Sequence, residues 1–131
     1  FALMEDPDDD NIIYSQNAEP GGLYCNDETD GESLIVCNQI FESLLAYETG
    51  GTAVVPSLAE SYESSADGLT WTFHLRQGVK FQDGTDLTAN DAVMSYAVAW
   101  DAANPLHVGR TGAFDYFSSL YAGLLNKPAA S

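Results

Sequence analysis

The chain has 131 residues, of which 45% are hydrophobic and 11% aromatic, a composition typical of one globular domain rather than a disordered segment. Its 20 acidic residues outnumber 4 basic ones, and the formal net charge is -16. Binding to phosphates requires clustered lysine and arginine, so we expect no nucleic-acid partner. No apolar run is long enough to span a membrane, and the acidic start does not predict a signal peptide, so we expect a mature or trimmed product.

Acidic residues are concentrated near the N-terminus, where a solvated segment is predicted. The alternative is a calcium site, because Asp6, Asp8 and Asp10 have the alternate spacing that begins a calcium-binding loop. Such a loop would need glycine in place of Asn11 and glutamate in place of Asn17. Both are missing, so we predict no metal site.

The chain has two cysteines, and no spacing of cysteine and histidine indicates zinc. Cys25 lies in a polar run and Cys37 in an apolar periodic segment, so a disulfide would fasten a loop to a helix. Such a bridge would indicate an oxidising compartment. Two buried free thiols are the alternative, and the spacing alone does not decide between them.

The first predicted element is a strand over residues 11–16 (NIIYSQ), which are β-branched and aromatic and run into the turn-forming stretch NAEPGG. The stretch NDETDGES then predicts an exposed polar loop. A helix is predicted to begin at Glu32 or Ser33 and to close at Gly50 and Gly51. Its apolar residues recur at spacings of three and four: Leu34, Cys37, Ile40, Phe41, Leu44 and Leu45.

Two strand-like runs flank Asp67-Gly68, a dipeptide that favours a tight turn, so a hairpin is predicted there. In its second strand, apolar and polar residues alternate, which predicts one buried face and places His74 on the other. The buried face is formed by Trp71, Phe73 and Leu75. Trp71, Phe73 and Trp100 are predicted to belong to the core.

A second turn is predicted at Asp83-Gly84, followed by a helix that begins after Thr88. Asp91 stands where a capping box usually has glutamate. The apolar residues of this helix share one face: Ala92, Val93, Tyr96, Ala97 and Trp100. The order of strands and helices is that of an α/β or α+β domain.

Few residues suggest catalysis. Only His74 and His107 could act as an imidazole base, and neither lies in a recognised catalytic pattern such as GxSxG. The glycines form neither GxGxxG nor a P-loop, so no nucleotide cofactor is expected. We therefore predict that the protein is not an enzyme and has no cofactor.

Four aromatic residues near the C-terminus follow a loop with turn-prone positions at Gly109, Thr111 and Gly112. They are Phe114, Tyr116, Phe117 and Tyr121. Aromatic residues on a loop can line a ligand pocket, and internal packing is the alternative.

The run VVPSLAESYESSADGLTWTFHLRQGVKFQDGTDLTANDAVMSY resembles the extracytoplasmic solute-binding proteins of the peptide/nickel class, which deliver ligands to ABC importers. The similarity extends back through IIYSQNAEPGGL and forward through NPLHVGRTGAFDYF. This family implies an α/β fold of two lobes that close over the ligand. Its members are several times longer, so residues 11–131 are expected to be the N-terminal portion of the first lobe, after an acidic segment over residues 1–10. The rest of that lobe and the second lobe are absent from this sequence.

The resemblance also implies ligand-binding positions. The loop after the family's first strand forms one wall of its cleft and corresponds here to Thr29, Asp30, Gly31 and Glu32. A later pocket aromatic corresponds to Phe114, with Tyr116 as a second candidate. Solvated loop and packing aromatics are the alternative reading of these residues.

The function implied is binding of a peptide, or of a related small solute such as a nickel complex or an oligosaccharide, for an ABC permease in the membrane. The expected location is periplasmic or at the cell surface, with a lipid anchor in the full precursor left open. The alternative is a truncated or processed fragment that acts as a structural or interaction subunit at the cell surface.

Overall fold

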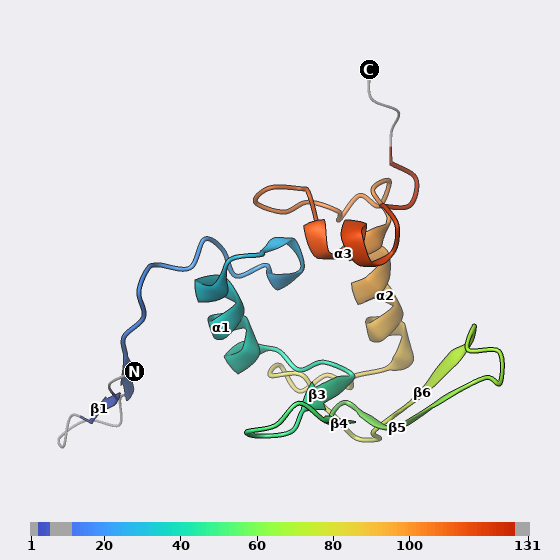
Figure 1. Ribbon diagram of the computed structural model, residues 1–131, viewed down its shortest axis with the longest axis horizontal. Helices are drawn as coiled ribbons and strands as arrows, with labels where there is room; N and C mark the ends of the chain where they lie inside the picture. The colour runs from blue at the N-terminus through green and yellow to red at the C-terminus, as the bar shows by residue number, and fades with distance from the viewer. Residues whose placement is uncertain (1–2, 6–11, 128–131) are drawn as a thin grey trace. The chain divides into compact units, whose positions relative to one another are not determined.

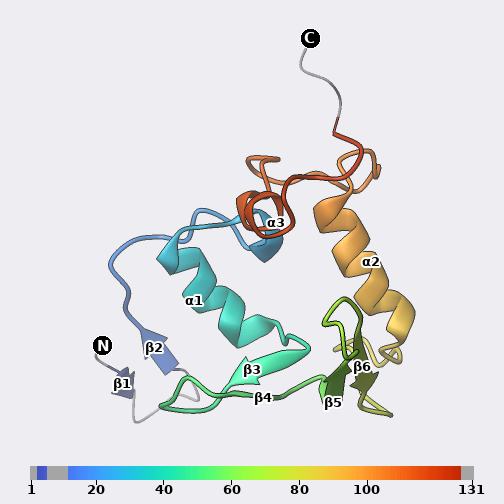
Figure 2. The same ribbon diagram turned by 45° about the vertical axis from the view of Figure 1, so that its right-hand side comes forward.

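The computed structural model describes residues 3–5 and 12–127. Strands and helices follow one another in groups along the chain (Figure 1): β1 (Leu3–Glu5), β2 (Ile12–Tyr14), the 3-10 helix η1 (Cys25–Asp27), α1 (Gly31–Ile40), β3 (Leu45–Tyr47), β4 (Val54–Pro56), β5 (Ala59–Ser64), β6 (Trp71–Leu75), α2 (Ala89–Trp100) and α3 (Asp115–Leu120). In the described residues the strands pair as separate antiparallel hairpins, β1 with β2, β3 with β4 and β5 with β6 (Figure 2).

The chain divides into two compact units. One comprises Phe1–Ile40 and Ala99–Ser131, and the other comprises Phe41–Val98. The first unit contains both stretches for which a ligand-binding role is predicted, so the candidate site can be described within that unit alone.

The hairpin of β5 and β6 forms as its sequence predicts. Gly68 has a φ of 71°, which suits glycine, and Ser65 donates its backbone N–H to the Thr70 carbonyl at 2.8 Å. Phe73 is half-buried and His74 is exposed, in agreement with the predicted alternation. The prediction that Trp71 belongs to the core is wrong for this structure: the residue is 55% exposed because the end of a lone two-stranded hairpin has no third layer over it.

The second predicted turn and the helix cap are also present. The Asp83 carboxylate accepts hydrogen bonds from the Thr85 amide at 2.9 Å and from the Thr85 hydroxyl at 2.6 Å. At the start of α2, the Asp91 carboxylate accepts hydrogen bonds from the backbone N–H and the hydroxyl of Thr88, both at 2.7 Å. Asp91 therefore does take the place of glutamate in the capping box. The predicted shared apolar face of α2 is only partly buried, since Val93 is 64% exposed.

The first long helix is shorter than predicted. The sequence predicts that it runs to Gly50, but α1 ends at Ile40; Phe41 and Leu44 lie between the elements and Leu45 begins β3. Leu45 is instead paired with Pro56 across the β3–β4 hairpin, whose turn includes Gly50 at a φ of 77°. The apolar periodicity predicts one helix, but its last residue, Leu45, pairs with the β-branched strand β4 instead.

At the N-terminus, the predicted strand over residues 11–16 corresponds to β2, which is paired with β1. Leu3–Glu5 therefore forms a strand within the stretch that was predicted to be a solvated acidic segment. The calcium-like spacing of Asp6, Asp8 and Asp10 lies outside the described residues.

Candidate functional site

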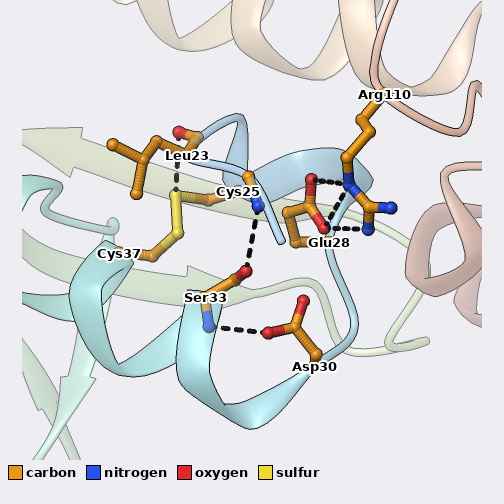
Figure 3. Close-up of a disulfide and its surroundings, with 8 residues drawn as sticks. Leu23, Cys25, Glu28, Asp30, Ser33, Cys37 and Arg110 are labelled. Atoms are coloured by element: carbon orange, nitrogen blue, oxygen red, sulfur yellow. Dashed lines mark hydrogen bonds and ion pairs between the residues drawn. A yellow bond between two sulfur atoms is a disulfide. The ribbon is translucent and has the colours of Figure 1, made fainter. Parts of the chain in front are cut away.

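A disulfide fastens η1 to α1. Cys25 and Cys37 are bonded, with their Cα atoms 5.9 Å apart, so the free-thiol alternative is not found in this structure (Figure 3). The Cys25 sulfur lies 3.4 Å from the Leu23 carbonyl oxygen, and because a bonded sulfur carries no hydrogen this is a contact rather than a hydrogen bond. Through this covalent link, the residues of η1 have a fixed position relative to α1.

The beginning of α1 is capped by Asp30. Its carboxylate accepts a hydrogen bond from the Ser33 amide at 2.8 Å, the geometry of an N-cap residue. This bond lowers the pKa of Asp30. The buried hydroxyl of Ser33 in turn accepts a hydrogen bond from the Gly22 amide at 3.2 Å. The chain before η1 is thus attached to the first turn of α1.

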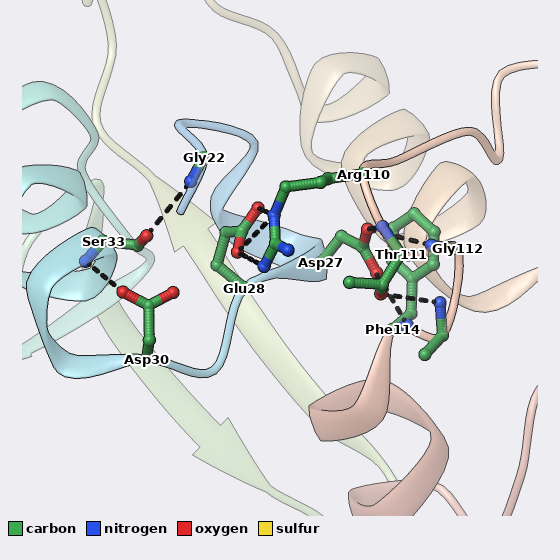
Figure 4. Close-up of polar contacts among 10 residues, drawn as sticks. Gly22, Asp27, Glu28, Asp30, Ser33, Arg110, Thr111, Gly112 and Phe114 are labelled. Carbon is green, nitrogen blue, oxygen red and sulfur yellow. Dashed lines mark hydrogen bonds and ion pairs between the residues drawn. The ribbon is translucent and has the colours of Figure 1, made fainter. Parts of the chain in front are cut away.

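Asp27 is buried in η1, and its carboxylate accepts four hydrogen bonds from one loop (Figure 4). One oxygen accepts from the Thr111 amide at 2.6 Å and the Gly112 amide at 3.0 Å. The other accepts from the Thr111 hydroxyl at 2.6 Å and the Phe114 amide at 3.0 Å. Burial alone would raise the pKa of Asp27, but the hydrogen bonds from Thr111, Phe114 and Gly112 outweigh it and lower the pKa to about 2.

Glu28, the next residue, forms an ion pair with Arg110. Its side chain is fully buried, and its two oxygens accept from Arg110 Nε at 3.0 and 3.2 Å and from Nη2 at 2.5 Å. The hydrogen bond and the charge of Glu28 raise the pKa of Arg110. A buried carboxylate is costly unless it is paired and hydrogen-bonded, and Arg110 meets both conditions.

Two glycines allow the chain to pass close to these carboxylates. A Cβ atom at Gly22 would collide with the Glu28 carboxylate, and one at Gly109 would collide with that of Asp27. Both positions therefore require glycine for close approach rather than for an unusual φ.

Phe114 ends the loop and precedes α3. Its side chain is fully buried, with its ring 5.8 Å from that of Tyr24 in an edge-on arrangement and 4.0 Å from that of His107 in a stacked one. Phe114 has a φ of 46° and a ψ of 50°, the left-handed region that a bulky residue rarely adopts. The hydrogen bond from its amide to Asp27 helps to hold that conformation.

The predicted ligand-binding residues occupy different environments. Thr29 and Gly31 are exposed, while Asp30 and Glu32 are half-buried at the start of α1. Tyr116 is 46% exposed on α3, whereas Phe114 is inaccessible in this structure. Their role in ligand binding stays a prediction. For Phe114, the burial favours the packing alternative that the sequence left open.

The structure joins the two predicted segments through Asp27, Glu28 and Arg110, which the sequence did not single out, and through Thr111, which it marked only as a turn position. Asp27 and Glu28 come directly before Thr29, and their partners Arg110 and Thr111 come shortly before Phe114. In an acidic chain, no carboxylate stands out by its residue type. The available signal was the scarcity of cations, because Arg110 is one of only 4 basic residues and lies in a glycine-rich loop.

No helix within residues 3–5 and 12–127 is long and apolar enough to cross a membrane. Across the same residues, no three histidine, cysteine, aspartate or glutamate side chains are grouped so that they could hold a metal ion.

Known proteins resemble both the sequence and the fold. The sequence profile of bacterial extracellular solute-binding proteins, family 5 Middle, matches residues 53–116. The dipeptide-binding protein of Escherichia coli (strain K12) is 34% identical over 116 residues, which cover 83% of this chain and 22% of the relative. Di/tripeptide-binding protein 4 of Pseudomonas aeruginosa (strain UCBPP-PA14) is 41% identical over 125 residues, or 89% of this chain and 23% of the relative.

A solved structure gives a matching result. An ABC-transporter-associated periplasmic binding protein from Helicobacter pylori, in complex with the peptide STSA, has a TM-score of 0.68 and 27% identity over 80% of this chain and 22% of its own. The elements described above therefore form part of a periplasmic solute-binding fold. The chain belongs to the family of bacterial extracellular solute-binding proteins, and it spans about a fifth of the length of the curated relatives it matches. The fold class and the family predicted from the sequence are confirmed.

Proposed function

We propose that this chain is part of an extracytoplasmic receptor that binds peptides and delivers them to an ABC importer. The observation that carries the proposal is the similarity to a dipeptide-binding protein over 83% of this chain. The solved relative with the peptide STSA gives independent support, because its fold matches over 80% of this chain. A receptor that binds and delivers its ligand needs no covalent chemistry.

The ligand-binding surface is proposed to include residues 29–32 and Tyr116. Thr29, Gly31 and Tyr116 are exposed, so their backbone or ring atoms are accessible to a ligand. Peptide receptors of varied specificity can bind the ligand backbone through main-chain hydrogen bonds and leave room for its side chains. We assign residues 11–131 to the first lobe, so most of the ligand contacts would come from the remainder of the protein.

The location is proposed to be outside the cytoplasm, either periplasmic or at the cell surface. The disulfide between Cys25 and Cys37 supports this, since such bonds persist in oxidising compartments. The partner would be a membrane permease, which would recognise the closed, ligand-bound form.

The test is isothermal titration calorimetry on the full-length protein that the gene encodes. We expect binding of a dipeptide such as Ala-Leu or of a tripeptide, with a nickel-histidine complex and an oligosaccharide as comparison ligands. Heat from one of the comparison ligands alone would reassign the ligand class, and no heat from any of them would count against the receptor.

The native mass distinguishes the alternative role as a fragment at the cell surface. A mass well above 14.1 kDa is expected for a receptor of this family. A native protein of 14.1 kDa that self-associates and binds no peptide would favour a structural or interaction subunit.

A further inference from the structure

Both candidate ligand-binding segments are attached to η1, and one side chain makes most of the connection. We propose that Asp27 is a positioning residue of the receptor, which holds the loop over residues 111–114 beside the segment over residues 29–32. The inference rests on the proposed function, because it assumes that residues 29–32 and Tyr116, which follows the loop, meet the ligand. It assigns Asp27 a role that does not require contact with the ligand.

The Asp27 carboxylate is satisfied entirely by the loop. Three of its four donors are backbone amides, those of Thr111, Gly112 and Phe114, and the fourth is the Thr111 hydroxyl. Backbone donors fix the path of the chain itself, whereas a side-chain donor could rotate away. The bonds extend over the turn up to Phe114, two residues before Tyr116, so they determine where α3 begins.

The ion pair between Glu28 and Arg110 supports the same arrangement. Glu28, directly after η1, holds Arg110, and Asp27, the last residue of η1, holds the next loop residue, Thr111. On the other side of η1, the disulfide at Cys25 attaches it to α1. The helix η1 is thus a rigid connection between the two segments, and Asp27 is its contact with the second.

The carboxylate of aspartate satisfies all four donors, whereas the amide of asparagine cannot. An ionised carboxylate accepts at both oxygens, whereas the amide of asparagine presents an NH₂ group at one of them. If that group replaced the oxygen near Thr111 and Gly112, it would face two backbone N–H groups. If it replaced the other, it would face the amide of Phe114. In either orientation, the isosteric variant Asp27→Asn leaves at least one backbone N–H of the loop without its acceptor.

The first test measures the loop without any ligand. In the full-length protein, we expect Asp27→Asn to speed amide hydrogen exchange by about tenfold or more at Gly112 or at Phe114, whichever loses its acceptor. Asp83→Asn is the matched control, since it removes the same charge from a hydrogen-bonded turn in the other unit. Equal exchange at these amides in both variants would overturn the proposal.

The second test measures affinity for Ala-Leu and uses two variants of Thr111, which donates one of the four hydrogen bonds to Asp27 through its hydroxyl. Thr111→Val removes the hydroxyl donor and keeps the shape of the side chain, so we expect weaker binding, while Thr111→Ser should restore it. Gly68→Ala, which strains a turn at a φ of 71°, lowers stability without touching Asp27. The three variants Gly68→Ala, Asp27→Asn and Thr111→Val are compared at an equal loss of thermal stability. If Gly68→Ala then weakens binding as much as the other two, the effect comes from lost stability alone and the proposal fails.

The two proposals fail separately. If the wild-type protein binds no peptide, the proposed function is wrong, whatever the exchange shows. If the wild type binds Ala-Leu and Asp27→Asn binds it equally well, the receptor stands and the positioning role of Asp27 is wrong.

Discussion

At the scale of single residues, the candidate site contains two adjacent buried carboxylates that are stabilised in different ways. Glu28 is neutralised by the guanidinium of Arg110, whereas Asp27 receives backbone and hydroxyl hydrogen bonds. Hydrogen bonds to the charged form of a carboxylic acid favour that form, which is why Asp27 stays ionised although it is buried.

The lowered pKa of Asp27 makes stability depend on pH. The pKa falls from 3.8 to about 2 on folding, so the ionised group stabilises the folded state fully above 3.8, and this stabilisation is lost as the pH falls through 2. The stabilisation amounts to about 2 kcal/mol. Urea unfolding of the wild type and Asp27→Asn should show a difference in unfolding free energy that shrinks by this amount between neutral and strongly acidic pH. Neighbouring charges such as Arg110 and Glu28 are common to both proteins, so a pH-independent difference would contradict the prediction.

The close approach of Gly22 to Glu28 gives a second prediction at this scale. A Cβ atom at Gly22 collides with the buried carboxylate, so Gly22→Ala should lower the unfolding free energy by about 1 to 3 kcal/mol, the usual cost of overpacking. Gly31→Ala is the control, because Gly31 has open space around it and begins a helix. Chemical denaturation should show Gly31→Ala unchanged or slightly stabilised. Equal losses in both variants would show that space at Gly22 is not the cause.

At the scale of elements, local signals decide where helices and turns begin. Thr88 and Asp91 cap α2, and Asp30 caps α1, each through hydrogen bonds within a few residues. The disulfide is the exception, because it links two elements covalently and restricts the unfolded chain as well as the folded one.

Removing the disulfide should loosen η1 from α1. Cys25 and Cys37 are separated by 12 positions, and closing a loop of this size stabilises a fold by about 2 to 3 kcal/mol. Adding a reductant should lower the midpoint of urea unfolding of the wild type to that of the double variant Cys25→Ser/Cys37→Ser. The double variant itself should not respond, and a response of similar size would mean that the reductant acts elsewhere.

The cap of α2 can be tested with a graded pair. Thr88→Ala removes the hydroxyl and should destabilise the protein by about 1 kcal/mol, whereas Thr88→Ser keeps the hydroxyl and should cost much less. Urea unfolding followed by circular dichroism measures both. If the two variants lose the same stability, the side-chain methyl group rather than the cap is responsible.

At the scale of the whole molecule, many large apolar side chains are exposed. Leu69 is 84% exposed, Leu120 76% and Tyr47 74%. The buried hydrophobic residues in the described part of the chain are few and mostly small: Cys37, Ala59, Ala99 and Phe114. Large exposed apolar side chains favour association with other apolar surface.

We therefore expect the 131-residue chain, produced by itself, to bind the hydrophobic dye ANS and to self-associate. The full-length protein should do neither to the same extent. Dye fluorescence and light scattering at equal molar concentration measure the difference. Equal dye binding by the two proteins would mean that the exposed side chains stay exposed in the receptor.

The sequence by itself determined the features that depend on neighbouring residues. The sequence predicted the turns at Asp67-Gly68 and Asp83-Gly84 and the cap at Thr88, because the backbone requirements of a turn or cap are met within a few positions. It also predicted the family, through the resemblance of whole segments. The helix that was expected to run to Gly50 shows the limit, since the pairing of Leu45 with Pro56 depends on a partner strand.

Only the tertiary structure decided the candidate site. Asp27 and Thr111 are separated by 84 positions, and Glu28 and Arg110 by 82, so no local pattern could pair them. In a chain with 20 acidic residues, most carboxylates are solvated, and what distinguishes Asp27 and Glu28 is burial against one particular loop. Burial and long-range hydrogen bonds depend on which distant segments the fold brings together. Composition and residue spacing do not contain that information.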